Sequence, residues 1–282
     1  MYLTSNGNCK KNINKKLKNF KSYFANNSSC AQEYLKNGYY IGEIENIELF
    51  REFNNQFNHI VKKLFKKKTD DFTLEKIHKI VNFKKINDFR IKIFHELNKV
   101  DDILPLFYFF AKQVIDEIIG NEIVMQKQVN LSIQMPNDKN STLNIHSDTF
   151  NGESPYQAVL WIPLTDAYKT NSMFILSPSQ NSALVKKMKQ YKDKPGIKKI
   201  YSDYQKKAKF VEIKKGQFLI FNSNLMHGNI TNNEINTRWS LNTRVKSLFS
   251  PYTSSEKNIG NFYKPLTLKP ATIMGLKFEK PV

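Results

Sequence analysis

The hydrophobic pattern of this 282-residue chain changes its period at Gln126, and this change constrains the fold more than any other feature of the sequence. From Gln126 to Met135, polar and mostly apolar residues alternate, which is typical of a strand with one buried face. Further short strands are predicted at 143–146, 156–162, 173–176, 210–213, 217–221 and 237–245. A succession of short strands separated by polar, Pro or Gly breaks predicts a cupin-like jelly roll, or double-stranded β-helix.

The segment before Gln126 has the period of helices instead. Apolar residues at helical spacing predict helices at 44–68, 72–81 and 88–97, and a more uniformly apolar, buried helix at 103–119. We interpret His59, His78 and His95, which fall within these helical segments, as surface or packing histidines. The predicted fold class is therefore a mainly β core with α additions, flanked by N-terminal helices.

The predicted organisation is a poorly ordered basic leader at 1–30 followed by a single domain at 31–282. Within this domain, 31–122 is a mostly helical support, 123–250 is the jelly-roll core and 251–282 is a C-terminal extension. A lysine-rich insert at 182–215 interrupts the core, and we expect it to form a helix and a surface loop.

The composition restricts the class of protein. A hydrophobic content of 40% is enough for a sizeable core. No segment approaches the roughly 20 apolar residues of a membrane span, and the N-terminus lacks the apolar region of a signal peptide. We therefore expect a cytoplasmic protein with no membrane span, in which Cys9 and Cys30 are free thiols.

The net charge of +19 is unevenly distributed. Residues 1–100 carry +10 and residues 182–215 carry +9, whereas the remaining segments sum to zero. The excess is lysine, accompanied by abundant Asn and Ile, and we interpret it mainly as compositional bias. The functional alternative is attraction to an anionic substrate, such as a phosphorylated or nucleotide-linked molecule.

Two histidines and an aspartate have the spacing of a metal site. His146 and Asp148 are two residues apart on a predicted extended segment, so their side chains project to the same side. His227 follows a later predicted strand. Two imidazoles and one carboxylate are the ligand set that binds one face of Fe(II) and leaves the opposite face open for a co-substrate and O₂. The sequence thus predicts that all three residues are metal ligands and catalytic.

The predicted strand at 237–245 supplies the second half of the candidate site. Arg238 and Ser240 share one face of this strand with Asn242 and Arg244. A guanidinium with a neighbouring hydroxyl suits the distal carboxylate of 2-oxoglutarate, the expected co-substrate. Two further polar residues are secondary candidates for cofactor binding, Asn229 and Gln128. Whether Arg244 contributes, and whether the bulk of Trp161 does more than fill the core, is left open by the sequence.

The chain resembles the phytanoyl-CoA dioxygenase-like superfamily of Fe(II)- and 2-oxoglutarate-dependent oxygenases, in particular bacterial members from carbohydrate and aminoglycoside biosynthesis clusters. The resemblance spans roughly residues 34 to 275, and it is carried by His146-Ser147-Asp148, the stretches 160–167 and 171–176, and His227-Gly228-Asn229 through Arg238. It implies that His146, Asp148 and His227 bind the iron. It also implies that Arg238 binds 2-oxoglutarate, with Ser240 and Asn229 assisting. Many relatives carry Pro-Gly-Ser-His after the central strand, where this chain has Ser177-Pro178-Ser179-Gln180.

Three functions remain open at this point. The first is an oxygenase that hydroxylates a small polar metabolite, which could be anionic, a sugar or another hydroxylated molecule, or equally an amino-acid derivative. A carboxylate at Asp148 argues against halogenation. The second is a nucleic-acid demethylase of the same iron class, which the position of the basic charge outside the core segments disfavours. The third is a non-catalytic jelly-roll binding protein. Around the substrate we expect Phe150, Tyr156 and the 151–153 loop, with Lys186, Lys187 and Lys189 holding an anionic group.

Overall fold

The structure is a computed structural model that describes residues 28–65, 73–81, 86–191 and 196–279. Most of the expected leader, including Cys9, lies outside these residues, while Cys30 is a free thiol. The N-terminal part contains α2 (Ser29–Asn37), α3 (Ile47–Phe65), the 3₁₀ helix η1 (Leu74–Lys79), α4 (Ile86–Leu97), α5 (Ile103–Phe110) and α6 (Lys112–Ile118). The N-terminal helices of the predicted fold class are therefore present. No helix within the described residues is long and apolar enough to cross a membrane.

The buried helix expected at 103–119 is two helices. Ala111, between α5 and α6, has φ −142° and ψ 29°, which is outside the helical region. The break lets Phe107 and Phe110 pack on the aromatic side chains of α3, where Phe110 contacts Phe50 at a centroid distance of 5.5 Å. A uniformly apolar segment has no sequence signal for such a change of direction.

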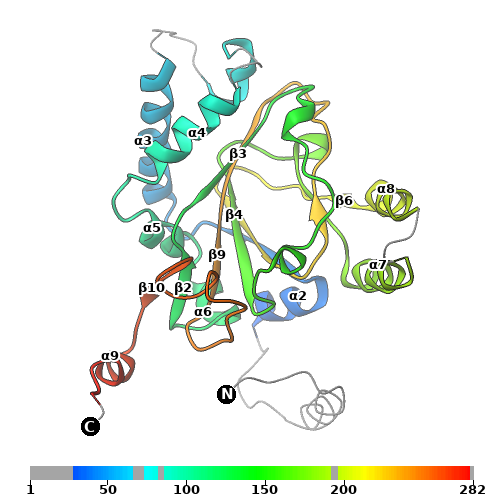
Figure 1. The fold of residues 1–282 in the computed structure, drawn as a ribbon. Helices are drawn as coiled ribbons and strands as arrows, with labels where there is room; N and C mark the ends of the chain where they lie inside the picture. The colour runs from blue at the N-terminus through cyan, green and yellow to red at the C-terminus, as the bar shows by residue number, and fades with distance from the viewer. Residues whose placement is uncertain (1–27, 66–72, 82–85, 192–195, 280–282) are drawn as a thin grey trace.

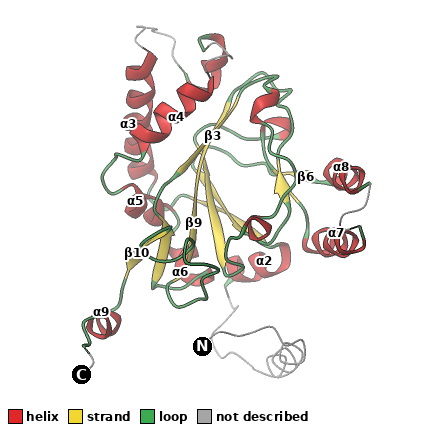
Figure 2. Ribbon diagram, viewed as in Figure 1, coloured by secondary structure: helices red, strands yellow, loops and turns green. Residues whose placement is uncertain are grey.

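The major sheet is antiparallel and has seven strands. The strands run through the middle of the molecule, with helices on both sides (Figure 2). Its order is β1 (Tyr39–Glu43), β7 (Gln217–Asn222), β4 (Gln157–Pro163), β9 (Arg238–Ser247), β2 (Ile123–Gln126) and β10 (Tyr263–Thr267), and β3 (Asn130–Gln134) also pairs with β9. β9 has ten residues, so it can pair with β2 through one half and with β3 through the other. This long strand carries Arg238, Ser240 and Arg244 of the candidate site.

The minor sheet has the order β6 (Lys209–Phe210), β5 (Phe174–Ile175) and β8 (His227–Gly228). Alternation along β4 shows how the layers pack. Leu160 and Ile162 belong to the core between the major sheet and the N-terminal helices, whereas Val159 and Trp161 pack with Met173 and Ile175 between the two sheets. The two facing sheets confirm the jelly-roll class, and within the described residues they do not close into a barrel.

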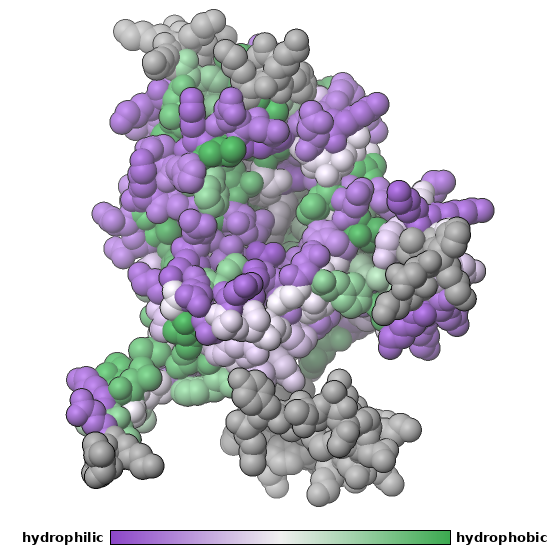
Figure 3. Space-filling view, viewed as in Figure 1, coloured by the Kyte–Doolittle hydropathy of each residue, from purple (hydrophilic) through white to green (hydrophobic). Residues whose placement is uncertain are grey.

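The lysine-rich segment forms two helices, not one helix and a loop: α7 (Pro178–Gln190) and α8 (Ile197–Lys207). The Ser177 hydroxyl accepts from the Gln180 backbone N–H at the first turn of α7, and the Ser177 backbone N–H donates to Gln180 Oε1, which together form a capping box. The segment Ser177–Gln180, which differs from the relatives' Pro-Gly-Ser-His turn, thus forms the N-terminal turn of α7. Both helices pack beside the minor sheet, away from α3 and α4 (Figure 1), and their visible surface is mostly hydrophilic (Figure 3). At the C-terminal end, α9 (Pro270–Leu276) follows β10 and has no buried residue.

Candidate active site

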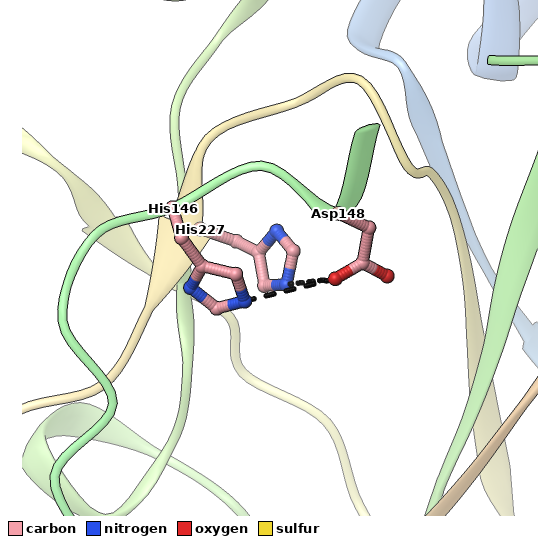
Figure 4. Close-up of side chains that lie close together, drawn as sticks. All are labelled: His146, Asp148 and His227. Carbon is pink, nitrogen blue, oxygen red and sulfur yellow. Dashed lines mark ion pairs between the residues drawn. The ribbon is translucent and has the colours of Figure 1, made fainter. Parts of the chain in front are cut away.

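The structure brings His146, Asp148 and His227 together from two distant parts of the chain (Figure 4). His227 lies in β8, and its backbone pairs with that of His146 through hydrogen bonds of 2.8 and 3.0 Å. Asp148 begins the 3₁₀ helix η4 (Asp148–Asn151), which turns its carboxylate toward both imidazoles. Asp148 Oδ1 lies 3.7 Å from His146 Nε2 and 3.9 Å from His227 Nε2.

Backbone hydrogen bonds orient both imidazole rings. His146 Nδ1 is 2.8 Å from the Asn144 carbonyl oxygen, and His227 Nδ1 is 2.9 Å from the Leu225 carbonyl oxygen. A carbonyl only accepts, so each Nδ1 carries the proton in the neutral ring and each Nε2 keeps its lone pair. Such hydrogen bonds are typical of histidines that bind a metal through the other ring nitrogen.

Electrostatics keep Asp148 and His227 in the protonation states that a metal needs. Burial, followed by the charge of His146, lowers the pKa of His227 to about 4. Burial alone would raise the pKa of Asp148, but the interaction with His146 and the positive charge of Arg244 hold it below the usual value. Near neutral pH, Asp148 is therefore ionised and His227 is neutral.

Arg238 is buried in the same cavity without a carboxylate partner among the described residues. Its Nε donates to the Asn171 carbonyl oxygen at 3.0 Å, its Nη1 to Ser240 Oγ at 2.5 Å and its Nη2 to Gln134 Oε1 at 2.8 Å. All three acceptors are neutral, and each terminal nitrogen keeps a second N–H. A buried cation without an anionic partner is costly, so this site is suited to an anionic ligand.

The cavity has a volume of about 270 Å³ and joins these features. It is lined by the three candidate metal ligands His146, Asp148 and His227, by Arg238 and by Trp161. The Trp161 ring centroid lies 5.7 Å from the Arg238 guanidinium carbon. The remaining lining is mixed polar and apolar: Asn130, Ser132, Leu143, Val159, Met173, Phe221, Gly228, Asn229, Asn242 and Arg244. Trp161 therefore does more than fill the core.

A comparison with protein-family models matches residues 43–234 to the phytanoyl-CoA dioxygenase (PhyH) family. This match covers more than half of the chain. The chain belongs to the phytanoyl-CoA dioxygenase family. It is thus an oxidoreductase of the dioxygenase type, and the resemblance to this family, inferred from the sequence motifs, is confirmed at the level of the family.

Solved structures agree with this fold. EctD from S. alaskensis in its apo form superimposes with a TM-score of 0.53 at 15% identity, covering 81% of this chain and 80% of EctD. The non-heme alpha-ketoglutarate-dependent carbocyclase SnoK from nogalamycin biosynthesis superimposes with a TM-score of 0.51 at 12% identity, covering 89% of this chain and 98% of SnoK. At these identities the likeness concerns the fold alone. No sequence among curated proteins matches the chain significantly.

The donor set fits the Fe(II) and 2-oxoglutarate that this dioxygenase family uses. Two imidazole nitrogens and a carboxylate oxygen on one side are the ligands of a facial triad. The ligand atoms of the three residues all lie within 4.8 Å of one another, so His146, Asp148 and His227 would hold a single ion together. The uncompensated Arg238 in the same cavity fits a carboxylate of the dianionic co-substrate.

The secondary candidate residues of this dioxygenase site differ in whether they lie at the cavity and in what they contact. Ser240 is buried and holds Arg238 through its hydroxyl. Asn229 lines the cavity, but its side chain accepts from the Leu143 backbone and donates to the Ser141 carbonyl oxygen, so it positions that segment. The assignment of Gln128 was wrong, because it is exposed in the bend between β2 and β3 and does not line the cavity. His59 and His95 are exposed, and His78 bonds Thr237, as expected of packing histidines.

Two residues that hold the site together were not assigned from the sequence. Gln134 accepts from Arg238 and donates to the Ile230 carbonyl oxygen, and it belongs to the polar face of β3 that the alternating pattern had indicated. Arg244 lines the same cavity and contacts Asp148 directly, at 3.1 Å between Nη2 and Oδ2. The shared strand face of Arg238 and Arg244 was the available signal for this second arginine.

Gly228 allows the two histidine-bearing segments to approach. A Cβ atom at this position would lie 2.6 Å from the Leu143 carbonyl oxygen and 2.9 Å from Phe174 Cζ. We expect Gly228→Ala to lower the free energy of unfolding by about 1–3 kcal/mol, as over-packing does, and to weaken metal binding because 143–146 is displaced from β8. Chemical denaturation and metal titration measure the two effects. Gly275→Ala is the control, since a Cβ there meets nothing, and equal stability of the two variants would contradict the packing role.

The metal-free protein should lose stability as the pH falls from 6.5 to about 4. The unfolded chain protonates His227 near its usual pKa of 6.5, whereas burial lowers the pKa in the folded state to about 4. Between these values the unfolded state binds more protons, so acid favours unfolding. Thermal melts across this range measure the decline. His227→Phe removes the titrating group, and an equally steep decline in that variant would show that another group is responsible.

Proposed function

We propose that this dioxygenase-family chain hydroxylates a C–H bond of a small polar metabolite, and that the substrate class is a sugar or a nucleotide-linked sugar. The observation that carries the reaction type is the pairing, in one cavity, of the His146–Asp148–His227 group with a buried Arg238 that has no carboxylate partner among the described residues. A metal site alone would fit many reactions. The additional uncompensated cation calls for a carboxylate-bearing co-substrate beside the metal.

Each residue then has a defined role. His146, Asp148 and His227 would hold Fe(II), and Arg238, supported by Ser240 and Gln134, would bind the distal carboxylate of 2-oxoglutarate. When bound, Fe(II) with 2-oxoglutarate and O₂ supplies an oxidant able to cleave a C–H bond, at the expense of decarboxylation of the co-substrate. The protein orients the co-substrate between two fixed points, and the apolar side chains of Val159, Met173 and Phe221 exclude water. Halogenation by this chemistry needs the position of the carboxylate ligand to be free for a halide ion. Because Asp148 occupies that position, hydroxylation is favoured over halogenation.

The cavity surface supports a polar substrate. Asn130, Ser132 and Asn242 offer amide and hydroxyl groups, and Leu143 adds an apolar side chain that is 52% exposed. Phe150 and Tyr156, which were expected near the substrate, are exposed but do not line the cavity. Hydroxyl-bearing rings bind to such surfaces through hydrogen bonds on their edges and apolar contacts on their faces. Glu153 is an exception to the expected substrate loop, because it is buried and paired with Lys257 at 2.6 Å.

The experiment that tests this proposal measures succinate formation from 2-oxoglutarate by Fe(II)-reconstituted protein. The panel contains free sugars, nucleotide-linked sugars and amino-acid derivatives, each with Asp148→Ala as the inactive control. We expect a sugar-type compound to accelerate succinate formation and to gain one oxygen atom, as seen by mass spectrometry. Acceleration by amino-acid derivatives alone would overturn the substrate class, and no iron-dependent succinate with any compound would count against the reaction.

The lysine-rich segment is not part of this proposal. Lys186, Lys187 and Lys189 are exposed on α7, and none of them lines the cavity. We therefore withdraw their expected role in holding an anionic group. Changing all three to glutamine should leave the KM of the substrate unchanged in the same assay, because the side chains lie outside the cavity. A raised KM confined to an anionic substrate would restore the role.

A further inference from the structure

The two oxygens of Asp148 have different partners. Oδ1 faces the Nε2 atoms of His146 and His227, at 3.7 and 3.9 Å. Oδ2 faces the other way and lies 3.2 Å from Arg244 Nε and 3.1 Å from Arg244 Nη2. The guanidinium therefore binds this oxygen with two of its nitrogens, which leaves Oδ1 as the free ligand atom.

Arg244 is itself fixed in this orientation. It lies on the cavity face of β9, and its Nη1 donates to Gln126 Oε1 at 2.9 Å. Its Nε also lies 3.8 Å from Glu153 Oε1, and the same Glu153 oxygen accepts from Lys257 Nζ at 2.6 Å. Four alternating charges thus connect the loop around Lys257 with the carboxylate of the metal-ligand group.

Burial gives this chain of charges its strength. The side chains of Asp148 and Glu153 are only 6% and 5% exposed, and that of Arg244 is 18% exposed. Surface ion pairs are weak, but a buried carboxylate whose partner is removed is left without compensation. The order of charges, Lys257, Glu153, Arg244 and Asp148, makes each member depend on its neighbour for its position.

We propose that Arg244 is a positioning residue that commits Asp148 to bind the metal through Oδ1 alone, and that Lys257, acting through Glu153, holds Arg244 in place. A carboxylate that binds through both oxygens would take up part of the face that the triad leaves open. Co-substrate and O₂ need that face. This inference rests on the proposed function, since it assigns a role toward the metal of that same site.

The test is the affinity and visible spectrum of Co(II) bound to the full chain, without turnover. Residues whose only role is to orient a ligand typically change metal affinity by roughly 10- to 100-fold when replaced. We expect Arg244→Met to weaken Co(II) binding within this range and to change the Co(II) spectrum, because Asp148 becomes free to bind through both oxygens. Arg244→Lys, which keeps the charge but offers one nitrogen, should be intermediate, and Lys257→Met should show a smaller loss.

Lys112→Met is the matched control, since Lys112 forms a 2.6 Å ion pair with Asp116 on the helical part of the molecule. It should bind Co(II) like the wild type. If Arg244→Met does not fold, Arg244→Lys and Lys257→Met decide the question. Wild-type affinity and spectrum in the folded Arg244 and Lys257 variants would overturn this inference and leave the proposed function standing. Failure of the wild type to bind Co(II) would instead overturn both.

Discussion

Arg238→Leu is expected to weaken 2-oxoglutarate binding by two to three orders of magnitude while leaving the metal site intact. Arg238 is only 2% exposed, and the free N–H groups of its guanidinium have no carboxylate to bind among the described residues. Removing one partner of a buried, hydrogen-bonded charge pair costs roughly 2–5 kcal/mol, and about 1.4 kcal/mol corresponds to a factor of ten in affinity. Calorimetric titration of Mn(II)-loaded protein with 2-oxoglutarate under anaerobic conditions measures the loss.

Two further variants distinguish the loss of carboxylate binding by Arg238 from a general disruption of the cavity. Arg238→Lys keeps a positive charge but cannot form two parallel hydrogen bonds to a carboxylate, so an intermediate affinity is expected. Ser240→Ala removes the hydroxyl that holds Nη1 and should have a smaller effect. Unchanged 2-oxoglutarate affinity in a folded Arg238→Leu protein would mean that the co-substrate binds elsewhere.

His227→Ala is expected to abolish stoichiometric metal binding and with it all turnover. The imidazole is one of three candidate ligands, it is neutral well below neutral pH, and its Nδ1 is already bonded to Leu225. No other histidine, cysteine or carboxylate among the described residues completes the group. Metal content after dialysis, measured by mass spectrometry, tests the prediction.

His59→Ala is the control for the loss of a histidine as such, because His59 is exposed on α3. It should bind metal and 2-oxoglutarate like the wild type. A His227→Ala protein that retains one equivalent of metal would show that His227 is not a ligand, and it would remove the triad from the account.

The chemistry-bearing residues of the site could be predicted from the sequence because their types and spacing are specific. His146 and Asp148 two residues apart, and Arg238 on an alternating strand, have few other interpretations when they occur together. Their convergence could not be read from the sequence in the same way. The bridge between His146 and His227 joins segments about eighty residues apart, and the register of such a long-range pairing is set by the whole sheet.

The error at Gln128 has a physical cause in the same region. The alternating pattern from Gln126 to Gln134 predicts one strand, but the chain bends at 127–129 and forms β2 and β3 separately. Val129 donates its backbone N–H to Asn98 of the helical part, a tertiary contact that no local pattern records. The polar face therefore continues at Asn130, Ser132 and Gln134, and Gln134 takes the place beside Arg238.

The measurement that tests the central claim most directly is an anaerobic titration of the purified protein with Fe(II) and 2-oxoglutarate. A 2-oxoglutarate molecule chelated to Fe(II) gives a weak visible metal-to-ligand charge-transfer band. We predict that this band appears in the wild type, is lost in His227→Ala, and in Arg238→Leu requires far more 2-oxoglutarate to develop. A wild-type protein that binds neither Fe(II) nor 2-oxoglutarate, and shows no band, would contradict the assignment of this cavity as an iron and 2-oxoglutarate site.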